Sequence, residues 1–145
     1  MWIKNIVDEL VEKHGTNNPY KIAKEKNIYV FERDMHEEIF GFYKYIRRNK
    51  FIYINSNLSE NKKFFTCSHE LGHSEMHTRI DTPFLKRKTL FSIDKIENEA
   101  NRFAIELLLP DELITEYLKY MTIQDIASLH ELPIDLVKVK CEKLF

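Results

Sequence analysis

The sequence predicts an α+β fold in which a small three-stranded sheet packs on helices and a helical pair ends the chain. Aromatic and β-branched runs are concentrated between residues 28 and 56. On both sides of them, apolar residues recur at helical spacing. Only three glycines and four prolines occur in 145 residues, so we expect regular elements. This length suits one domain, with a core over about 1–110 and a helical tail over about 111–145.

Two helices are expected before the sheet. The first covers residues 2–14 and ends at His14–Gly15, and the second begins at Asn18–Pro19 because proline suits a first helical turn. The apolar residues that give the first helix its period are Ile3, Ile6, Val7, Leu10 and Val11.

The three predicted strands lie in two segments. The run "IYVFER" at 28–33 is rich in β-branched and aromatic residues. Residues 40–56 contain two more such runs, separated by the polar "RRNK" at 47–50. This pattern predicts a β-hairpin.

The rest of the chain is expected to be mainly helical. The predicted helices cover 59–78, 94–109, about 111–120, and a final pair within 122–144 that is broken near Leu132–Pro133. Ser59 and Asp94 are the expected N-caps, and Pro110 stops the second of these helices. The stretch 78–92 contains Pro83 and has no clean period, so we expect a loop there.

Composition argues against several classes of protein. The formal net charge of −1 gives no field that points to nucleic acid or to a membrane surface. No apolar run is long enough to span a bilayer, and the acidic residues near the N-terminus argue against a signal peptide. Cys67 and Cys141 form no disulfide framework. We therefore expect a cytoplasmic protein without a membrane partner.

The segment "HELGH" at 69–73 has the residue types and spacing of a catalytic metal site. Residues four apart lie on one face of a helix, so His69 and His73 can direct their imidazoles at one ion, and zinc suits such ligands. Glu70 is rotated by about 100° around the helix axis, which places it beside the ion as a general base for water. The alternative is a surface helix that happens to stack histidines. The apolar neighbours that argue against it are Phe64, Phe65, Leu71 and Met76.

A catalytic zinc usually needs a third protein ligand. The histidine position of metzincins is occupied by Arg79, and His77 lies a full turn beyond His73. Glu97 and Glu99 fall at opposite edges of the apolar face of the helix at 94–109, and Glu106 is a weaker third option. Periodicity alone does not choose between Glu97 and Glu99.

Three features together resemble the ImmA/IrrE family of zinc-dependent metallopeptidases. They are "HELGH" at 69–73, His77 one turn later, and "ENEANRFAIELLLP" at 97–110. The last segment is similar to the family's E-A-N-x-F-A-x-x-L-L-x-P pattern. The resemblance covers most of the chain, and the first 30 residues are the least diagnostic.

The resemblance implies zincin-type active-site helices in a single metallopeptidase domain. It implies His69, His73 and Glu99 as ligands of Zn2+ in a gluzincin-like arrangement, with Glu70 as the catalytic base. It also implies a regulatory zinc endopeptidase whose protein substrate is a helix-turn-helix repressor, encoded nearby in a phage or mobile element.

The C-terminal pair at 123–140 has the spacing of a helix-turn-helix. Glu131 stands where such turns often prefer glycine. The second helix has few basic residues and many acidic neighbours, which argues against direct binding to nucleic acid. The residues that give the helix-turn-helix spacing are Ala127, Leu132 and Val137, and the lysines are Lys138, Lys140 and Lys143.

A second interpretation is a binding protein: a zinc-containing anti-repressor that inactivates the repressor without proteolysis. The HExxH motif argues against it, because a structural zinc usually has four protein ligands and the sequence offers three convincing ones.

Overall fold

A computed structural model describes residues 2–79, 85–86 and 95–144. The helices are α1 (Trp2–His14), α2 (Pro19–Glu25), α3 (Glu60–Met76), α4 (Lys95–Leu108), α5 (Asp111–Tyr117), α6 (Ile123–His130) and α7 (Ile134–Leu144). The strands are β1 (Tyr29–Arg33), β2 (Ile39–Ile46), β3 (Asn49–Asn55) and β4 (Leu85–Lys86). The predicted α+β class is confirmed. The expected cap Asp94 and most of the expected loop lie outside the described residues.

The sheet has the order β1-β3-β2-β4, with β3 parallel to β1 and antiparallel to β2. The three predicted strands are present, and β4 pairs with the start of β2 as a short addition. A strand of two residues has no periodicity that a sequence can display. The hairpin turns at Arg47 and Arg48, which have φ angles of 50° and 68°. Two left-handed residues make the tightest hairpin connection, so β3 already begins at Asn49, within the segment that the sequence assigned to the turn.

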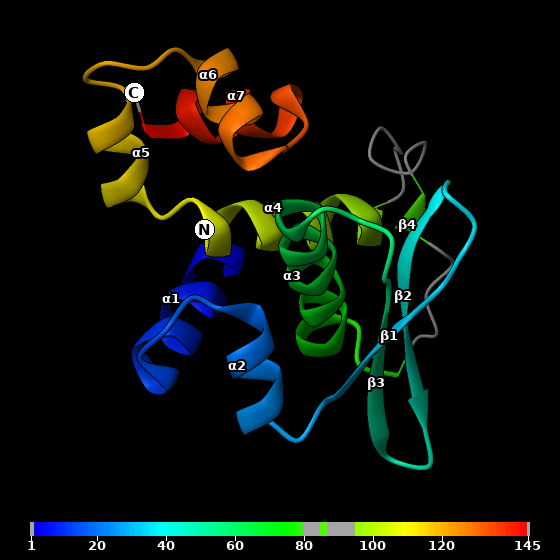
Figure 1. The fold of residues 1–145 in the computed structure, drawn as a ribbon. Coiled ribbons are helices and arrows are strands. Elements are labelled where there is room, and N and C mark those ends of the chain that lie inside the picture. The colour runs from blue at the N-terminus through cyan, green and yellow to red at the C-terminus, as the bar shows by residue number, and fades with distance from the viewer. Residues whose placement is uncertain (1, 80–84, 87–94, 145) are drawn as a thin grey trace.

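Helix α3 lies on the sheet, and α4 lies beside α3 (Figure 1). Gly41 of β2 permits the first contact, because a Cβ atom there would collide with the carbonyl of Tyr53 and the methyl group of Thr66. Gly72 of α3 permits the second, since its Cβ would lie 3.0 Å from three atoms of Phe103 on α4. The two glycines therefore bring the sheet, α3 and α4 close together.

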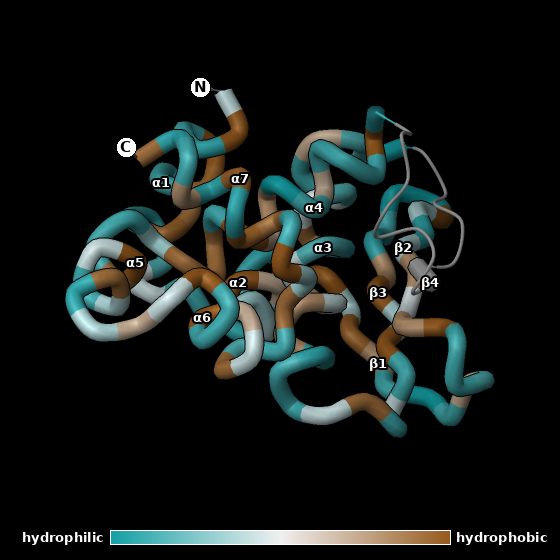
Figure 2. The backbone as a smooth tube through the Cα atoms, turned by 90° about the horizontal axis from the view of Figure 1, so that it is seen from above, coloured by the Kyte–Doolittle hydropathy of each residue, from teal (hydrophilic) through white to brown (hydrophobic). Residues whose placement is uncertain are grey.

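Two hydrophobic clusters contain residues of both α3 and α4, and Figure 2 shows these two helices side by side. One cluster joins α1 and α2 to the sheet and to residues such as Leu71 and Phe103. The other joins Phe65 and Ile105 to the three C-terminal helices. Apolar side chains thus hold both helices on two sides, which fixes their relative rotation.

Local caps explain where the helices begin. Ser59 accepts a hydrogen bond from the backbone of Lys62 and caps α3, as predicted. Asn18 caps α2 in the same way. Thr122 and Asp125 form a capping box at the start of α6.

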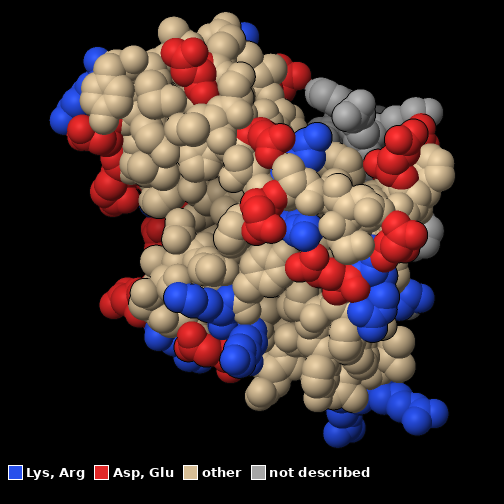
Figure 3. Space-filling view, viewed as in Figure 1, with Lys and Arg blue, Asp and Glu red and all other residues tan. Residues whose placement is uncertain are grey.

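The C-terminal pair α6–α7 has the predicted helix-turn-helix-like form. Glu131 ends α6 in the left-handed conformation, with φ of 52°, at the position where glycine was the expected residue. On the face seen in Figure 3, acidic and basic side chains are interspersed and Lys and Arg form no cluster over α6 and α7. Among the described residues, no helix has the length and hydropathy needed to cross a bilayer.

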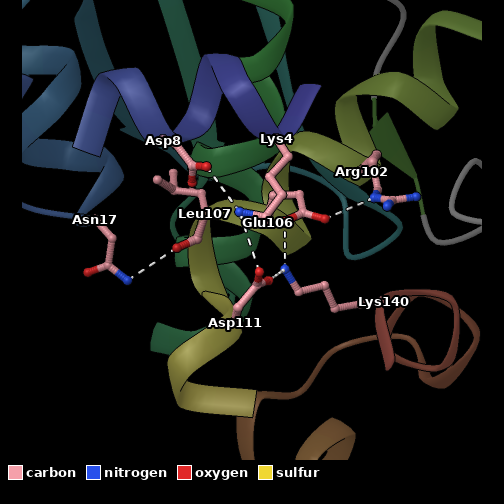
Figure 4. A network of polar contacts seen from close by, with 8 residues as sticks. All are labelled: Lys4, Asp8, Asn17, Arg102, Glu106, Leu107, Asp111 and Lys140. Carbon is pink, nitrogen blue, oxygen red and sulfur yellow. Dashed lines mark hydrogen bonds and ion pairs between the residues drawn. The ribbon is translucent and has the colours of Figure 1, made fainter. Parts of the chain in front are cut away.

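A buried ion network ties α7 to α4 (Figure 4). Lys140 Nζ lies 2.6 Å from Glu106 Oε2 and 2.5 Å from Asp111 Oδ1. Arg102 contacts Glu106, and Lys4 of α1 contacts Asp111. The side chain of Lys140 is only 2% exposed, so this lysine is an internal counter-ion and lies inside the protein. The same contacts account for Glu106, which was the weakest candidate for a metal ligand.

Candidate active site

The two motif histidines converge as their spacing predicts. His69 and His73 are fully buried on α3, and their Nε2 atoms lie 3.2 Å apart. The helix is held here by the packing of Gly72 against Phe103, which leaves the histidine face turned toward the first turns of α4. Among the residues that the structure describes, α4 is the element that offers a third group to this pair.

Glu97 is the carboxylate that the structure brings to this pair. Its Oε2 lies 3.2 Å from His69 Nε2, and its Oε1 lies 2.8 Å from His73 Nε2. Glu99, the ligand that the resemblance implied, lies elsewhere and contacts Nε2 of His77 at 2.9 Å. Two positions along a helix differ by about 200° in direction, so only one of these glutamates can face the histidines.

Asn101 completes the α4 side of the site. Its Oδ1 accepts a hydrogen bond of 2.8 Å from Nδ1 of His69. The proton on Nδ1 leaves a lone pair on Nε2, which points at Glu97. Asn101 follows Glu97 by four residues, so both lie on the same face of α4.

The charge state of the site follows from burial and pairing. Burial lowers the pKa of His69, but the hydrogen bond and charge of Glu97 and the charge of Glu70 raise it above its ordinary value. Burial dominates for His73 and lowers its pKa to about 4. Burial also raises the pKa of Glu97, but the two imidazoles beside its carboxylate outweigh this and lower it to about 2. Glu97 is therefore ionised at neutral pH.

The two imidazole Nε2 atoms and the two carboxylate oxygens of Glu97 have the spacing that a small cation requires. Their contacts measure 2.8 to 3.2 Å, and ligands bound at 2.0–2.1 Å in a tetrahedron lie about 3.3 Å apart. Glu97 Oε1 is buried and has no hydrogen bond of acceptable geometry from the described residues, despite its closeness to His73. Two imidazoles and an ionised carboxylate fit a divalent metal ion.

Glu70 lies beside this triad. It is fully buried, and His69, Glu70 and His73 each offer a ligand atom within 4.8 Å of the others. Cys67 is also buried, and burial raises the pKa of its thiol well above the ordinary value. A protonated thiol is a poor metal ligand, so the site is a histidine–carboxylate site.

Residues 23–142 match the IrrE N-terminal-like domain family. The chain belongs to this family. It is 50% identical over 139 residues to the uncharacterised immunity region protein 2 of Bacillus phage phi105, covering 95% of this chain and 88% of that protein. It is 34% identical over 121 residues to the metallopeptidase ImmA of Bacillus subtilis strain 168, and the match covers 82% of this chain and 70% of ImmA. The family and this relative identify a metallopeptidase of the immunity-region type, as the resemblance indicated.

Sequence reasoning did not find Asn101, and it did not choose Glu97. A signal was present, because Glu97 and Asn101 are four residues apart and so share one face of α4, where both are buried. Glu99 does not share that face.

Proposed function

We propose that this protein is a zinc-dependent endopeptidase in which His69, His73 and Glu97 hold the metal. The observation that carries the proposal is the convergence of three ligand atoms from α3 and α4 in a buried site, with Glu70 next to them. Histidine and carboxylate ligands suit zinc. Three protein ligands leave one position open, which is typical of a catalytic zinc.

Zinc bound there would act as a Lewis acid toward a water molecule and the scissile carbonyl group. Glu70 would accept the proton of the attacking water and deliver it to the leaving amine. Its position beside the two histidines suits this role, because its carboxylate lies within reach of a water molecule bound to the metal. Asn101 would keep His69 in the tautomer that exposes Nε2.

We propose a protein substrate, specifically a helix-turn-helix repressor encoded beside the gene in a phage or mobile element. Similarity to a phage immunity region protein supports this genetic setting. A repressor is found in the cytoplasm, so the proposal also places the protein there. The alternative is an anti-repressor that binds the repressor and leaves it intact. The open zinc position and the buried Glu70 favour cleavage over binding alone.

The test is co-expression of that repressor with the wild type or with Glu70→Gln, followed by intact mass measurement of the repressor. Two discrete fragments with the wild type alone are expected, because loss of a general base costs about 10²–10⁴-fold in rate. Bound zinc is measured in both proteins by atomic emission, since Glu70→Gln is expected to retain the metal. A Glu70→Gln protein that cleaves fully, purified free of other proteases, would exclude this role for Glu70. Relief of repression without cleavage would favour the binding interpretation.

A further inference from the structure

His77 is a buried histidine that the proposed metal site does not use as a ligand. It lies just after α3, one turn beyond His73, and is 8% exposed. Its Nδ1 lies 3.0 Å from Nδ1 of His73, on the side of the His73 ring that faces away from Glu97. Its Nε2 lies 2.9 Å from Oε1 of Glu99. Glu99, His77 and His73 thus form a chain of contacts, and His73 joins this chain to the other two proposed ligands, His69 and Glu97.

The positions of the protons in this chain follow from what each group can donate. Oε1 of Glu99 is the acceptor in its contact with His77, so Nε2 of His77 carries the proton between them. Nδ1 of His77 is then left as an acceptor, and the proton between the two imidazoles belongs to Nδ1 of His73. His73 is therefore left with a lone pair on Nε2, the atom 2.8 Å from Glu97 Oε1.

We propose that His77 and Glu99 are positioning residues that hold His73 in its metal-binding tautomer through two successive hydrogen bonds. The inference rests on the proposed metal site. Metal-bound histidines commonly donate their second N–H to a carboxylate or a carbonyl. Here the acceptor is a second imidazole, which is itself oriented by a carboxylate from the neighbouring helix.

The contact between His14 and Glu25 shows what an ordinary histidine–carboxylate pair looks like in this protein. His14 Nδ1 lies 3.0 Å from Glu25 Oε1, with the histidine side chain 6% exposed. Nε2 of His14 has no hydrogen-bond partner among the described residues, so no further group is linked to Glu25 through this ring. His77 differs because both of its ring nitrogens are engaged and one of them meets His73. His14 is therefore a matched control.

The first test is the dissociation constant for zinc, measured by competition with a chromogenic chelator. We expect His77→Phe to weaken zinc binding roughly tenfold to hundredfold, the usual effect of losing the partner of a metal-bound histidine. Glu99→Ala is expected to weaken it about tenfold, and Glu99→Gln, which keeps an acceptor oxygen, to recover most of that loss. His14→Phe should bind zinc like the wild type.

The Glu99 variants also cover the case in which His77→Phe does not fold, since the Glu99 side chain is 17% exposed and not in the core. A wild type that binds no zinc overturns both the proposed function and the relay. A wild type that binds zinc, with His77→Phe and Glu99→Ala equal to it, overturns the relay alone.

The second test is a spectroscopic signature that a purely structural role would not produce. Long-range ¹H–¹⁵N correlation spectra of the zinc-loaded wild type report which nitrogen of each imidazole is protonated. We expect His77 to be protonated on Nε2 and bare on Nδ1. A His77 proton on Nδ1 would overturn the assignment, because Nδ1 could not then accept from His73.

Discussion

Glu97 Oε1 lies 2.8 Å from Nε2 of His73, across the interface between α3 and α4. The two residues belong to different segments of the sequence motif, and their meeting depends on how the two helices pack. Because the other oxygen of Glu97 reaches His69, one carboxylate bridges both imidazoles. Helix packing thus assembles the proposed ligand set, and the predictions below test the residues responsible.

The choice between the two glutamates gives the first prediction. Glu97→Ala should weaken zinc binding by more than about a hundredfold, beyond the usual effect of a residue that only supports a ligand. Glu99→Ala, two positions away, should weaken zinc binding by about tenfold, because Glu99 acts on the metal site only through His77. Equilibrium competition with a chelator measures both. The reverse order would move the third ligand back to Glu99, where the family resemblance had put it.

Asn101 gives the second prediction. Asn101→Ala removes the acceptor of the His69 Nδ1 proton, so zinc affinity should fall roughly tenfold or more. Asn101→Asp keeps an acceptor oxygen at the same position and should bind zinc more tightly than Asn101→Ala. The zinc dissociation constants of the two variants are compared after circular dichroism has shown that both variants are folded. Equal affinities would show that the hydrogen bond does not influence the metal.

Gly72 gives the third prediction. Its missing Cβ would lie 3.0 Å from Phe103, so Gly72→Ala should push α4 away from α3. We expect a loss of about 1–3 kcal/mol in the free energy of unfolding, as is usual for overpacking. Urea denaturation measures it. The double variant Gly72→Ala/Phe103→Ala should lose less than the sum of the two single variants, since two of the three crowding atoms, Cγ and Cδ1 of Phe103, are then absent. If the two losses in unfolding free energy were strictly additive, Gly72→Ala would not act through contact with Phe103.

Lys140 gives the fourth prediction. Lys140→Met leaves the buried carboxylate of Glu106 without its main counter-ion, which should cost about 3–5 kcal/mol in unfolding free energy. Adding Glu106→Gln to this variant should restore part of the loss, because the unpaired charge is removed. Lys119, whose ion pair with Glu116 is exposed, is the matched control. Lys119→Met should change stability by less than about 0.5 kcal/mol.

Most of the fold could be predicted because its elements have clear local signals. Apolar residues at helical spacing, together with Ser59 as a cap and Pro19 as a first-turn residue, placed α1, the start of α2 and α3 within a residue or two. The hairpin turn was placed too broadly because Arg47 and Arg48 adopt left-handed conformations without the glycine or asparagine that usually indicates them. Strand β4 forms by pairing with β2, and the sequence of two residues is too short to predict a pairing partner.

The site was predictable as far as one helix determines it. His69, Glu70 and His73 share α3, so their arrangement follows from the helical period. The third ligand depends on the rotation of α4 against α3, which is set by the contact of Gly72 with Phe103 and by apolar clusters on both sides. Contacts between segments distant in the sequence decide that rotation, and periodicity within one segment cannot reveal it.

The buried ion network has a consequence for how the protein is made. Helix α4 carries Glu97 near its start and Glu106 near its end, and the counter-ion of Glu106 is Lys140 on α7. A ribosome synthesises α7 after every other described element. The helix that supplies the third ligand is therefore fully stabilised only after residue 140 has left the exit tunnel. The nascent chain thus completes its fold, and with it the proposed metal site, only after translation has passed its last helix.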